Sequence, residues 1–174
     1  LRLKSIVDEF DDYLDVGLRD TAPMRLMTVE AFCEKLRMEY ESELMDADEL
    51  FRIECRCPQE QIICNWEHMR RFFGNLIGNS IQHARAGHLE LRLRCCREGE
   101  QVVFLFWDNG KGVPPELLQQ IFEPLYTTDP GRKVSGLGLS ICKSIMKAHG
   151  GTVGAESGPE GGLLVRASLP CVHL

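Results

Sequence analysis

The sequence predicts an α+β fold, a two-layer α/β sandwich in which a mostly antiparallel mixed sheet packs against three helices. A chain of 174 residues that is 44% hydrophobic is long enough for one buried core and too short for two ordinary domains. Segments with a helical spacing of apolar residues are interspersed with short runs rich in Leu, Val, Ile and Phe. Two pairs of these runs flank short glycine turns, which favours antiparallel pairing.

The expected elements follow from these patterns in chain order. We expect a strand at 24–28, a helix at 29–47, strands at 51–55 and 61–64, a helix at 66–84, strands at 88–97 and 101–107, a short helical piece at 115–121, a helix at 137–149, and strands at 152–157 and 163–169. The turn at 98–100 (EGE) joins the fourth and fifth strands into a hairpin, and the turn at 158–162 (GPEGG) joins the last two.

Residues 1–22 are expected to be separate from the folded domain at 23–174. Their apolar residues recur at alternating steps of four and three, namely Leu3, Val7, Phe10 and Leu14. This spacing is typical of a helix that pairs with another helix, although an ordinary amphipathic surface helix explains it equally well. Residues 17–23 then have the composition of a linker.

Composition and charge exclude several classes of function. The formal net charge is -6 and no long Lys/Arg run occurs, so nucleic acid is not expected as a partner. No apolar stretch approaches the roughly 18 residues of a membrane helix, so this fragment is expected to make no direct membrane contact. The eight cysteines lie mostly in apolar runs without Cys-x-x-Cys spacing, which favours reduced thiols over disulfides or zinc.

The segment 108–135 is predicted to be a long loop that only the short helical piece interrupts. Loops of this length are uncommon in compact domains unless they act as lids or binding loops. Glycine-rich motifs stand at both of its ends. We therefore expect the chemistry of the protein in this region.

Three polar residues lie on the helix at 66–84, along the edge of its apolar arc: Asn75, Asn79 and His83. Amides one turn apart place two neutral oxygen ligands side by side. Such ligands suit a hard cation that keeps several waters, such as Mg²⁺. The alternative is that both amides face solvent or cap loops.

Asp108 directly follows the apolar strand at 101–107 and precedes Gly110 and Gly112. A carboxylate at a strand end can accept a hydrogen bond from an exocyclic amine, and glycines two apart let a planar ring approach the backbone. Adenine fits this arrangement, although a plain Asp/Asn/Gly turn would have the same residues.

The last predicted helix opens with Gly136, Leu137, Gly138 and Leu139. The free N–H groups and the helix dipole at such a start form a site for phosphate oxygens. Because these residues do not follow a strand, glycine loops of the Rossmann and Walker type are disfavoured.

In order and spacing, four segments resemble the N, G1, F and G2 boxes of sensor histidine kinases: 75–80 (NLIGNS), 108–112 (DNGKG), 121–128 (IFEPLYTT) and 136–139 (GLGL). These kinases belong to the ATPase superfamily that also holds DNA gyrase, heat-shock chaperones and mismatch-repair ATPases. The resemblance spans about residues 65 to 170.

This resemblance implies that ATP and Mg²⁺ are the cofactors. Asn79 would coordinate Mg²⁺ bridging the phosphates, and Asp108 would bind the adenine amine. Gly110 and Gly112 would shape the base pocket. His83 stands where the family usually has an aromatic ring against adenine, and an imidazole can still stack there over a smaller area.

The resemblance also implies a long ATP lid at 122–135. Arg132 and Lys133 would contact the phosphates, and Gly136 and Gly138 would form the hinge. Phe122 is expected to anchor the lid by packing. The chain departs from residues frequent in the family at Asn65, His68, Gln82 and Leu163. The lysine replaced by Gln82 would have supplied a cation near the phosphates. Its absence is expected to affect nucleotide affinity and the rate of phosphoryl transfer, but not the fold.

Asn75 stands where the ATPases and serine kinases of the superfamily generally carry a Glu that activates the acceptor. An amide cannot take a proton near neutral pH, so the resemblance implies transfer to a histidine, which needs less help. None of the five histidines lies in a sequence like the phosphoacceptor box of the family. The acceptor is therefore expected on a separate dimerisation domain, with 1–16 as its end.

The resemblance further implies a response regulator as a partner and a homodimer in the full-length protein. It implies a cytoplasmic location, with anchoring of the full-length protein in the inner membrane left open. Two alternatives remain. One is a nucleotide-binding module with decayed kinase activity, consistent with Gln82 and Leu163. The other is a serine kinase or ATPase of the same superfamily, against which Asn75 argues.

Overall fold

The computed structural model describes residues 23–40, 49–84, 87–123 and 138–174. The described elements are β1 (Arg25–Thr28), α2 (Val29–Tyr40), β2 (Glu49–Cys55), β3 (Gln61–Cys64), α3 (Trp66–Gln82), β4 (Leu89–Glu98), β5 (Gln101–Asp108), the 3₁₀ turn η1 (Pro115–Leu117), α4 (Gly138–Ala148), β6 (Thr152–Ser157) and β7 (Leu163–Pro170). The expected strands and helices are confirmed in type and order. The helical piece expected at 115–121 is shorter, and the predicted leader and the continuation of the first helix to 47 lie outside the described residues.

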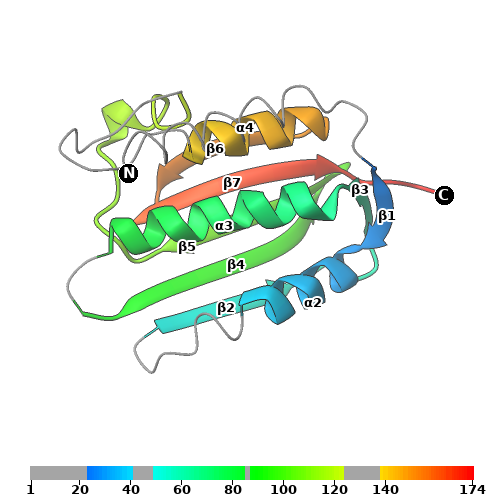
Figure 1. The fold of residues 1–174 in the computed structure, drawn as a ribbon, viewed down its shortest axis with the longest axis horizontal. Helices are drawn as coiled ribbons and strands as arrows, with labels where there is room; N and C mark the ends of the chain where they lie inside the picture. Colours follow the sequence, from blue (N-terminus) through cyan, green and yellow to red (C-terminus); the bar gives the residue numbers. More distant parts are fainter. Residues whose placement is uncertain (1–22, 41–48, 85–86, 124–137) are drawn as a thin grey trace, which may run out of the picture.

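The main sheet has five strands in the order β2-β4-β5-β7-β6, while β1 and β3 form a separate two-stranded sheet. β2 runs parallel to β4, and the other neighbours in the main sheet are antiparallel. Figure 1 shows α2, α3 and α4 lying across one face of this sheet. The predicted two-layer sandwich with a mostly antiparallel mixed sheet is therefore confirmed.

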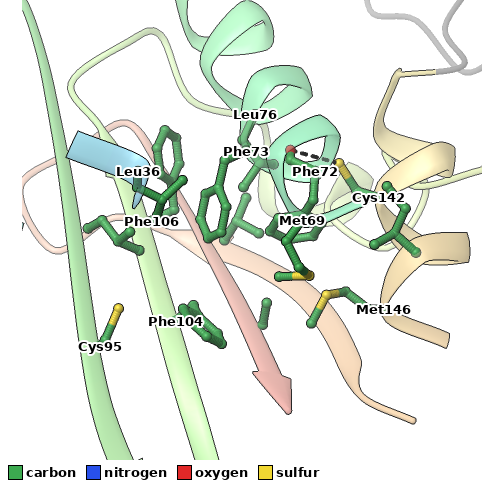
Figure 2. Close-up of a cluster of buried hydrophobic side chains, with 14 of the residues drawn as sticks. Leu36, Met69, Phe72, Phe73, Leu76, Cys95, Phe104, Phe106, Cys142 and Met146 are labelled. Carbon is green, nitrogen blue, oxygen red and sulfur yellow. Dashed lines mark hydrogen bonds between the residues drawn. The ribbon is translucent and has the colours of Figure 1, made fainter. Parts of the chain in front are cut away.

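Aromatic side chains fill the space between the helices and the sheet. Phe72 and Phe73 of α3 pack edge to face with 5.0 Å between ring centroids, and Phe73 lies 6.0 Å from Phe104 of β5. Figure 2 shows Cys142 of α4 beside Phe72, where the Cys142 Sγ donates a hydrogen bond to the Phe72 carbonyl at 3.5 Å. This packing fixes how α3 and α4 lie over β5 and therefore where the ends of α3 and β5 meet.

α3 begins at a cap that residues at the end of α4 help to hold. Asn65 is the N-cap, and its Oδ1 accepts a hydrogen bond from the His68 N–H at 3.1 Å. The N–H of Asn65 donates to Nε2 of His149, directly after α4, at 3.0 Å. The asparagine at position 65 thus keeps a capping side chain, and it joins two helices of the layer.

Among the described residues, no helix combines the length and the apolar character needed to cross a membrane.

Candidate functional site

Asp108 is a buried carboxylate at the end of β5, with 4% of its surface exposed. Its Oδ2 accepts a hydrogen bond from the Ser80 hydroxyl of α3 at 2.8 Å. Its Oδ1 accepts from the backbone N–H groups of Gly110 at 2.9 Å and Leu163 at 3.4 Å. A carboxylate has about four lone-pair sites, so the described residues leave one site on Oδ2 open to a further donor.

The loop after Asp108 is anchored to both of its neighbours in the fold. The Asn109 side chain accepts from the Glu90 N–H at 2.9 Å and donates to the His88 carbonyl at 2.8 Å, which ties the loop to β4. The Lys111 N–H donates to the His83 carbonyl at 3.1 Å, which ties it to the C-terminal end of α3. The position of the Asp108 carboxylate is therefore set by β5, by β4 and by the C-terminal end of α3.

Gly110 occupies a position where a side chain does not fit. A Cβ placed there would lie 2.8 Å from the His83 carbonyl oxygen and 2.9 Å from Oδ1 of Asp108. Gly112 has a φ of +73°, which L side chains rarely adopt, and its Cβ would lie 3.1 Å from the Gly162 carbonyl oxygen. Close approaches of neighbouring groups of the chain therefore disfavour side chains at both glycines.

A second glycine turn, at 158–162, presses against the end of β5. Gly162 has a φ of +74°, and a Cβ there would lie 1.9 Å from the Asp108 carbonyl oxygen. The Trp107 Nε1 donates to the Gly161 carbonyl at 2.8 Å. A Cβ at Gly158 would lie 2.4 Å from that same Trp107 nitrogen. This turn was expected only to connect strands, and the structure shows that it also supports Asp108 from the far side.

Three residues of α3 line up at steps of four: Asn75, Asn79 and His83. The Asn75 Nδ2 is buried and has no hydrogen-bond partner among the described residues. Asn79 is half-buried, and His83 is the C-cap of α3, with its N–H donating to the Asn79 carbonyl at 3.1 Å. A buried donor without a partner is uncommon in folded proteins, so Asn75 offers a hydrogen bond that a ligand can take up.

The glycine-rich start of the last helix is described only in part. Gly138 is the first residue of α4, and Leu139 is half-buried against the core. The predicted site residues Arg132, Lys133, Gly136 and Leu137 lie outside the described residues. Phe122 is 6% exposed and belongs to the core cluster, as expected of a residue that packs rather than contacts a ligand.

The described residues contain no group of three or more His, Cys, Asp or Glu side chains that could hold a metal ion. A cation bound here would rely instead on amide oxygens and on the ligand itself. Hard cations such as Mg²⁺ accept this arrangement because they keep several waters and take oxygen ligands from phosphates. The neutral donor set of α3 fits such a cation and disfavours a transition metal.

Sequence reasoning missed two contributors to this site, Ser80 and the turn at 158–162. Ser80 stands next to Asn79 in the sequence, but nothing in its position shows that its hydroxyl reaches the end of another element. The density of glycine at 158–162 was a usable signal, because three glycines in five residues exceed what a simple hairpin turn needs. Leu163 replaces a frequent Thr, yet it holds Asp108 through its backbone N–H while its side chain is buried in the core.

Comparisons with known proteins identify the family of this chain. The family model described as histidine kinase-, DNA gyrase B-, and HSP90-like ATPase matches residues 64–173. Sensor histidine kinase GtrS of Pseudomonas aeruginosa is 38% identical over 107 residues, which cover 61% of this chain and 22% of GtrS. Sensor protein IrlS of Burkholderia pseudomallei is 31% identical over 172 residues, which cover 90% of this chain and 36% of IrlS. The chain thus spans about a third or less of the length of these two relatives.

Solved structures with the same fold include ShkA and the histidine kinase ThkA. Full-length ShkA in complex with AMPPNP has a TM-score of 0.82 at 22% identity, covering 99% of this chain and 36% of ShkA. Histidine kinase ThkA in complex with response regulator protein TrrA has a TM-score of 0.78 at 22% identity, covering 98% of this chain and 48% of ThkA.

Proposed function

Because this chain belongs to the family of histidine kinase-, DNA gyrase B- and HSP90-like ATPases, we propose that it is the ATP-binding catalytic domain of a two-component sensor histidine kinase. In this proposal, residues 23–174 form the catalytic domain, and residues 1–22 are the end of a dimerisation helix with its linker. The γ-phosphoryl group of ATP is transferred to a histidine on the dimerisation domain. The buried, three-sided hold on the Asp108 carboxylate is the observation that carries the proposal.

Asp108 recognises adenine. Its open acceptor site on Oδ2 takes a hydrogen bond from the exocyclic amine of the base. A base that carries a carbonyl oxygen at the same ring position has no hydrogen to donate to Asp108. Gly110 and Gly112 keep side chains away from the base, and the His83 ring stacks on it. The carboxylate is pre-organised by its three donors, so little ordering is needed when the nucleotide binds.

The phosphates are bound by α3 and by the start of α4. Asn79 would ligate Mg²⁺ through its amide oxygen, and the Asn75 Nδ2, which has no partner among the described residues, would donate to a phosphate oxygen. The backbone N–H groups of 136–139 bind phosphate oxygens. Arg132 and Lys133 add positive charge. When bound, Mg²⁺ neutralises charge on the phosphoryl oxygens.

Transfer to histidine follows from what the α3 side chains can do. Phosphoryl transfer depends chiefly on positioning and on charge neutralisation, which amides, backbone donors and cations supply. Asn75 cannot act as a general base, since an amide takes no proton near neutral pH. A neutral imidazole already has a free lone pair for attack on the γ-phosphorus. The site therefore suits a histidine acceptor better than water or a serine hydroxyl.

The partners of this domain follow from the proposed reaction. It binds ATP and releases ADP, meets the histidine-bearing dimerisation domain, and works in a cytoplasmic homodimer whose phosphohistidine serves a response regulator. ThkA, which shares the fold, was solved with a response regulator. By itself, the domain binds nucleotide and turns over little ATP.

The first experiment is a thermal-shift titration with Mg-ADP on the native chain and on Asp108→Asn. The asparagine keeps an acceptor oxygen for the Gly110 and Leu163 N–H groups, and the Ser80 hydroxyl can rotate to accept from the new amide. We therefore expect the variant to fold. Its amide nitrogen stands in the place of Oδ2, so it donates a hydrogen bond and cannot accept one from the adenine amine. At about 100-fold excess over its dissociation constant, ADP should stabilise the native chain by roughly 2.7 kcal/mol and the variant by much less.

The matched control is Glu98→Gln, which removes the same charge from an exposed carboxylate at the other end of the hairpin. It should shift with ADP as the native chain does. If native chain and Asp108→Asn shift equally, or neither shifts, the adenine assignment is wrong. Transfer from ATP to an added histidine-bearing domain then tests the kinase activity, and steady phosphate release without that domain would instead indicate an ATPase.

A further inference from the structure

Three cysteine thiols from three elements meet beneath α2, away from the nucleotide site. Cys33 lies on α2, Cys55 on β2 and Cys95 on β4. Cys55 and Cys95 are Cα partners in the parallel β2·β4 register, so their side chains leave the same face of the sheet. The Sγ atoms of Cys33 and Cys95 are 3.7 Å apart, within S–H···S hydrogen-bond distance. Figure 2 shows Cys95 at the edge of the buried cluster, beside Phe104.

The three thiols differ in their access to solvent. Cys33 and Cys95 are fully buried, whereas Cys55 is half-buried. No group of metal-binding side chains occurs in the described part of the chain, so the cluster is not a set of metal ligands there. Two roles are left for these thiols, apolar packing and thiol chemistry.

The surroundings of Cys33 favour a reactive thiol. The hydrogen bond with Cys95 lowers the pKa of the Cys33 thiol from its ordinary value, with help from Cys55 and the Arg37 guanidinium and against the effect of burial. Arg37 is held one turn along α2, where it donates to the Ile53 carbonyl at 3.2 Å. Burial raises the pKa of the Cys55 thiol to about 11. Cys33 is therefore the thiol of the cluster whose pKa is lowered, although burial and Glu34, which pairs with Arg37, act in the opposite direction.

We propose that Cys33 and Cys95 are a redox-active thiol pair that hydrogen peroxide converts into a disulfide. The Cys33 thiolate attacks the peroxide, so an S–O bond forms, the O–O bond breaks, and the leaving hydroxide takes a proton to become water. The Cys95 sulfur then displaces the hydroxyl group of the Cys33 sulfenic acid. The S–S bond forms, the S–O bond breaks, and the second water leaves with the Cys95 proton. Two thiols and one peroxide thus give one disulfide and two waters.

Cys33 and Cys95 are fully buried, so the oxidant reaches Cys33 only when the packing around it opens locally. The disulfide links α2 to β4 across 62 positions of sequence. Such a link restricts the unfolded chain, so the oxidised protein unfolds at a higher temperature than the reduced one. This proposal does not depend on nucleotide binding or kinase activity.

The test treats the reduced, folded chain with hydrogen peroxide, blocks the remaining thiols with N-ethylmaleimide in denaturant, and maps the peptides by mass spectrometry. We expect the loss of two of the eight thiols and a linked pair of peptides that contain Cys33 and Cys95. A parallel sample oxidised in denaturant should give mixed links, because the geometry that selects the pair is lost. If the folded chain keeps both thiols, or gives the same mixture as the denatured chain, the proposal is wrong.

Two variants sharpen the result. Cys95→Ala should abolish the link and form the Cys33 sulfenic acid more slowly, because Cys33 loses the hydrogen bond that lowers its pKa. Dimedone added together with denaturant should trap that sulfenic acid, whereas trapping at Cys55 alone would contradict the assigned order. The matched control is Cys142→Ala, which removes another fully buried thiol whose hydrogen bond goes to the Phe72 carbonyl instead of to sulfur. Cys142→Ala should form the Cys33–Cys95 link to the same extent as the native chain. Mapping of the native chain decides the question even if Cys95→Ala does not fold.

Discussion

Ser80 and Asp108 form a buried hydroxyl–carboxylate pair across two elements, with 1% and 4% of their surfaces exposed. A buried carboxylate oxygen without a donor costs free energy, so the Ser80 hydroxyl stabilises the folded chain as well as the orientation of Asp108. Because the hydroxyl uses one site on Oδ2 and leaves one, it determines the direction from which a ligand amine is accepted. Ser80 is thus a positioning residue for the proposed adenine contact.

Replacing Ser80 with alanine should weaken ADP binding. The Asp108 Oδ2 loses its donor, and we expect a loss of roughly 1–3 kcal/mol in unfolding free energy together with about three- to tenfold weaker ADP affinity. Ser80→Thr keeps the hydroxyl and should recover most of the affinity. Calorimetric titration with Mg-ADP and urea unfolding measure the two effects separately.

Ser144→Ala, which removes a half-buried hydroxyl from α4, is the control for the loss of a serine as such. It should bind ADP like the native chain. Equal ADP affinity of Ser80→Ala and the native chain would show that Ser80 has only a structural role.

At the level of elements, the glycine turn at 158–162 and the loop after Asp108 form one unit. Gly112 and Gly162 face each other across this unit, and the Trp107 indole is held by the turn while the Arg92 guanidinium lies 4.6 Å above its ring. The end of β5 is therefore fixed by backbone contacts from both sides. Small residues are required here because the approaching groups are backbone atoms, which cannot move aside as side chains do.

Gly162→Ala should lower the free energy of unfolding by more than the cost of placing an alanine at a positive φ. A positive φ alone costs an alanine roughly 1–2 kcal/mol, and here the added Cβ would also lie 1.9 Å from the Asp108 carbonyl oxygen. We therefore expect a larger loss of unfolding free energy and weaker ADP binding, measured by urea unfolding and by titration.

Gly150→Ala separates the two causes. Gly150 has a φ of +70°, but a Cβ there has no atom within 4 Å. Gly150→Ala should lose only the unfolding free energy that the positive φ costs. Its affinity for ADP should be unchanged. If Gly162→Ala behaves like Gly150→Ala, the turn does not support the site.

The elements themselves were predictable because their signals are local. The helical spacing in α3 and the apolar run of β5 each depend on neighbours in sequence, so both were expected within a few residues of their bounds. Asp108 and Asn79 were predicted as site residues from their positions at the end of β5 and on α3. Ser80 and Gly162 were not, because their roles depend on contacts across 28 positions of sequence for Ser80 and on the approach of β7 to β5 for Gly162. The parallel pairing of β2 with β4 is likewise a tertiary result that neither strand encodes alone.

For the molecule as a whole, His149 joins the end of one helix to the start of another. Its Nε2 accepts from the Asn65 N–H at 3.0 Å, and its Nδ1 lies 2.7 Å from the Ile145 carbonyl. The carbonyl can only accept, so Nδ1 carries the proton and the ring is neutral. Since Asn65 caps α3, the contact couples the two helices that cover the centre of the sheet.

Protonation of His149 should therefore destabilise the whole fold. Burial lowers the pKa of His149 below the ordinary 6.5, against a smaller opposing effect of the Ile145 carbonyl. Well above pH 6.5 the ring is neutral in both the folded and the unfolded chain and causes no pH dependence. As the pH falls below that value, the unfolded chain takes up a proton that the folded chain resists, so the unfolding free energy decreases until the pH reaches the folded-state pKa. The slope is at most about 1.4 kcal/mol per pH unit.

Urea unfolding of the native chain and of His149→Gln between about pH 5 and pH 8 measures this contribution. The glutamine carbonyl can still accept from the Asn65 N–H but does not titrate, so its unfolding free energy should fall less steeply with acid. His88→Gln removes an exposed imidazole and should follow the native profile. Parallel profiles for the native chain and His149→Gln would mean that the acid-sensitive group lies elsewhere. A flatter profile for His149→Gln alone would assign the loss to this contact, because the two variants differ only in which imidazole is removed.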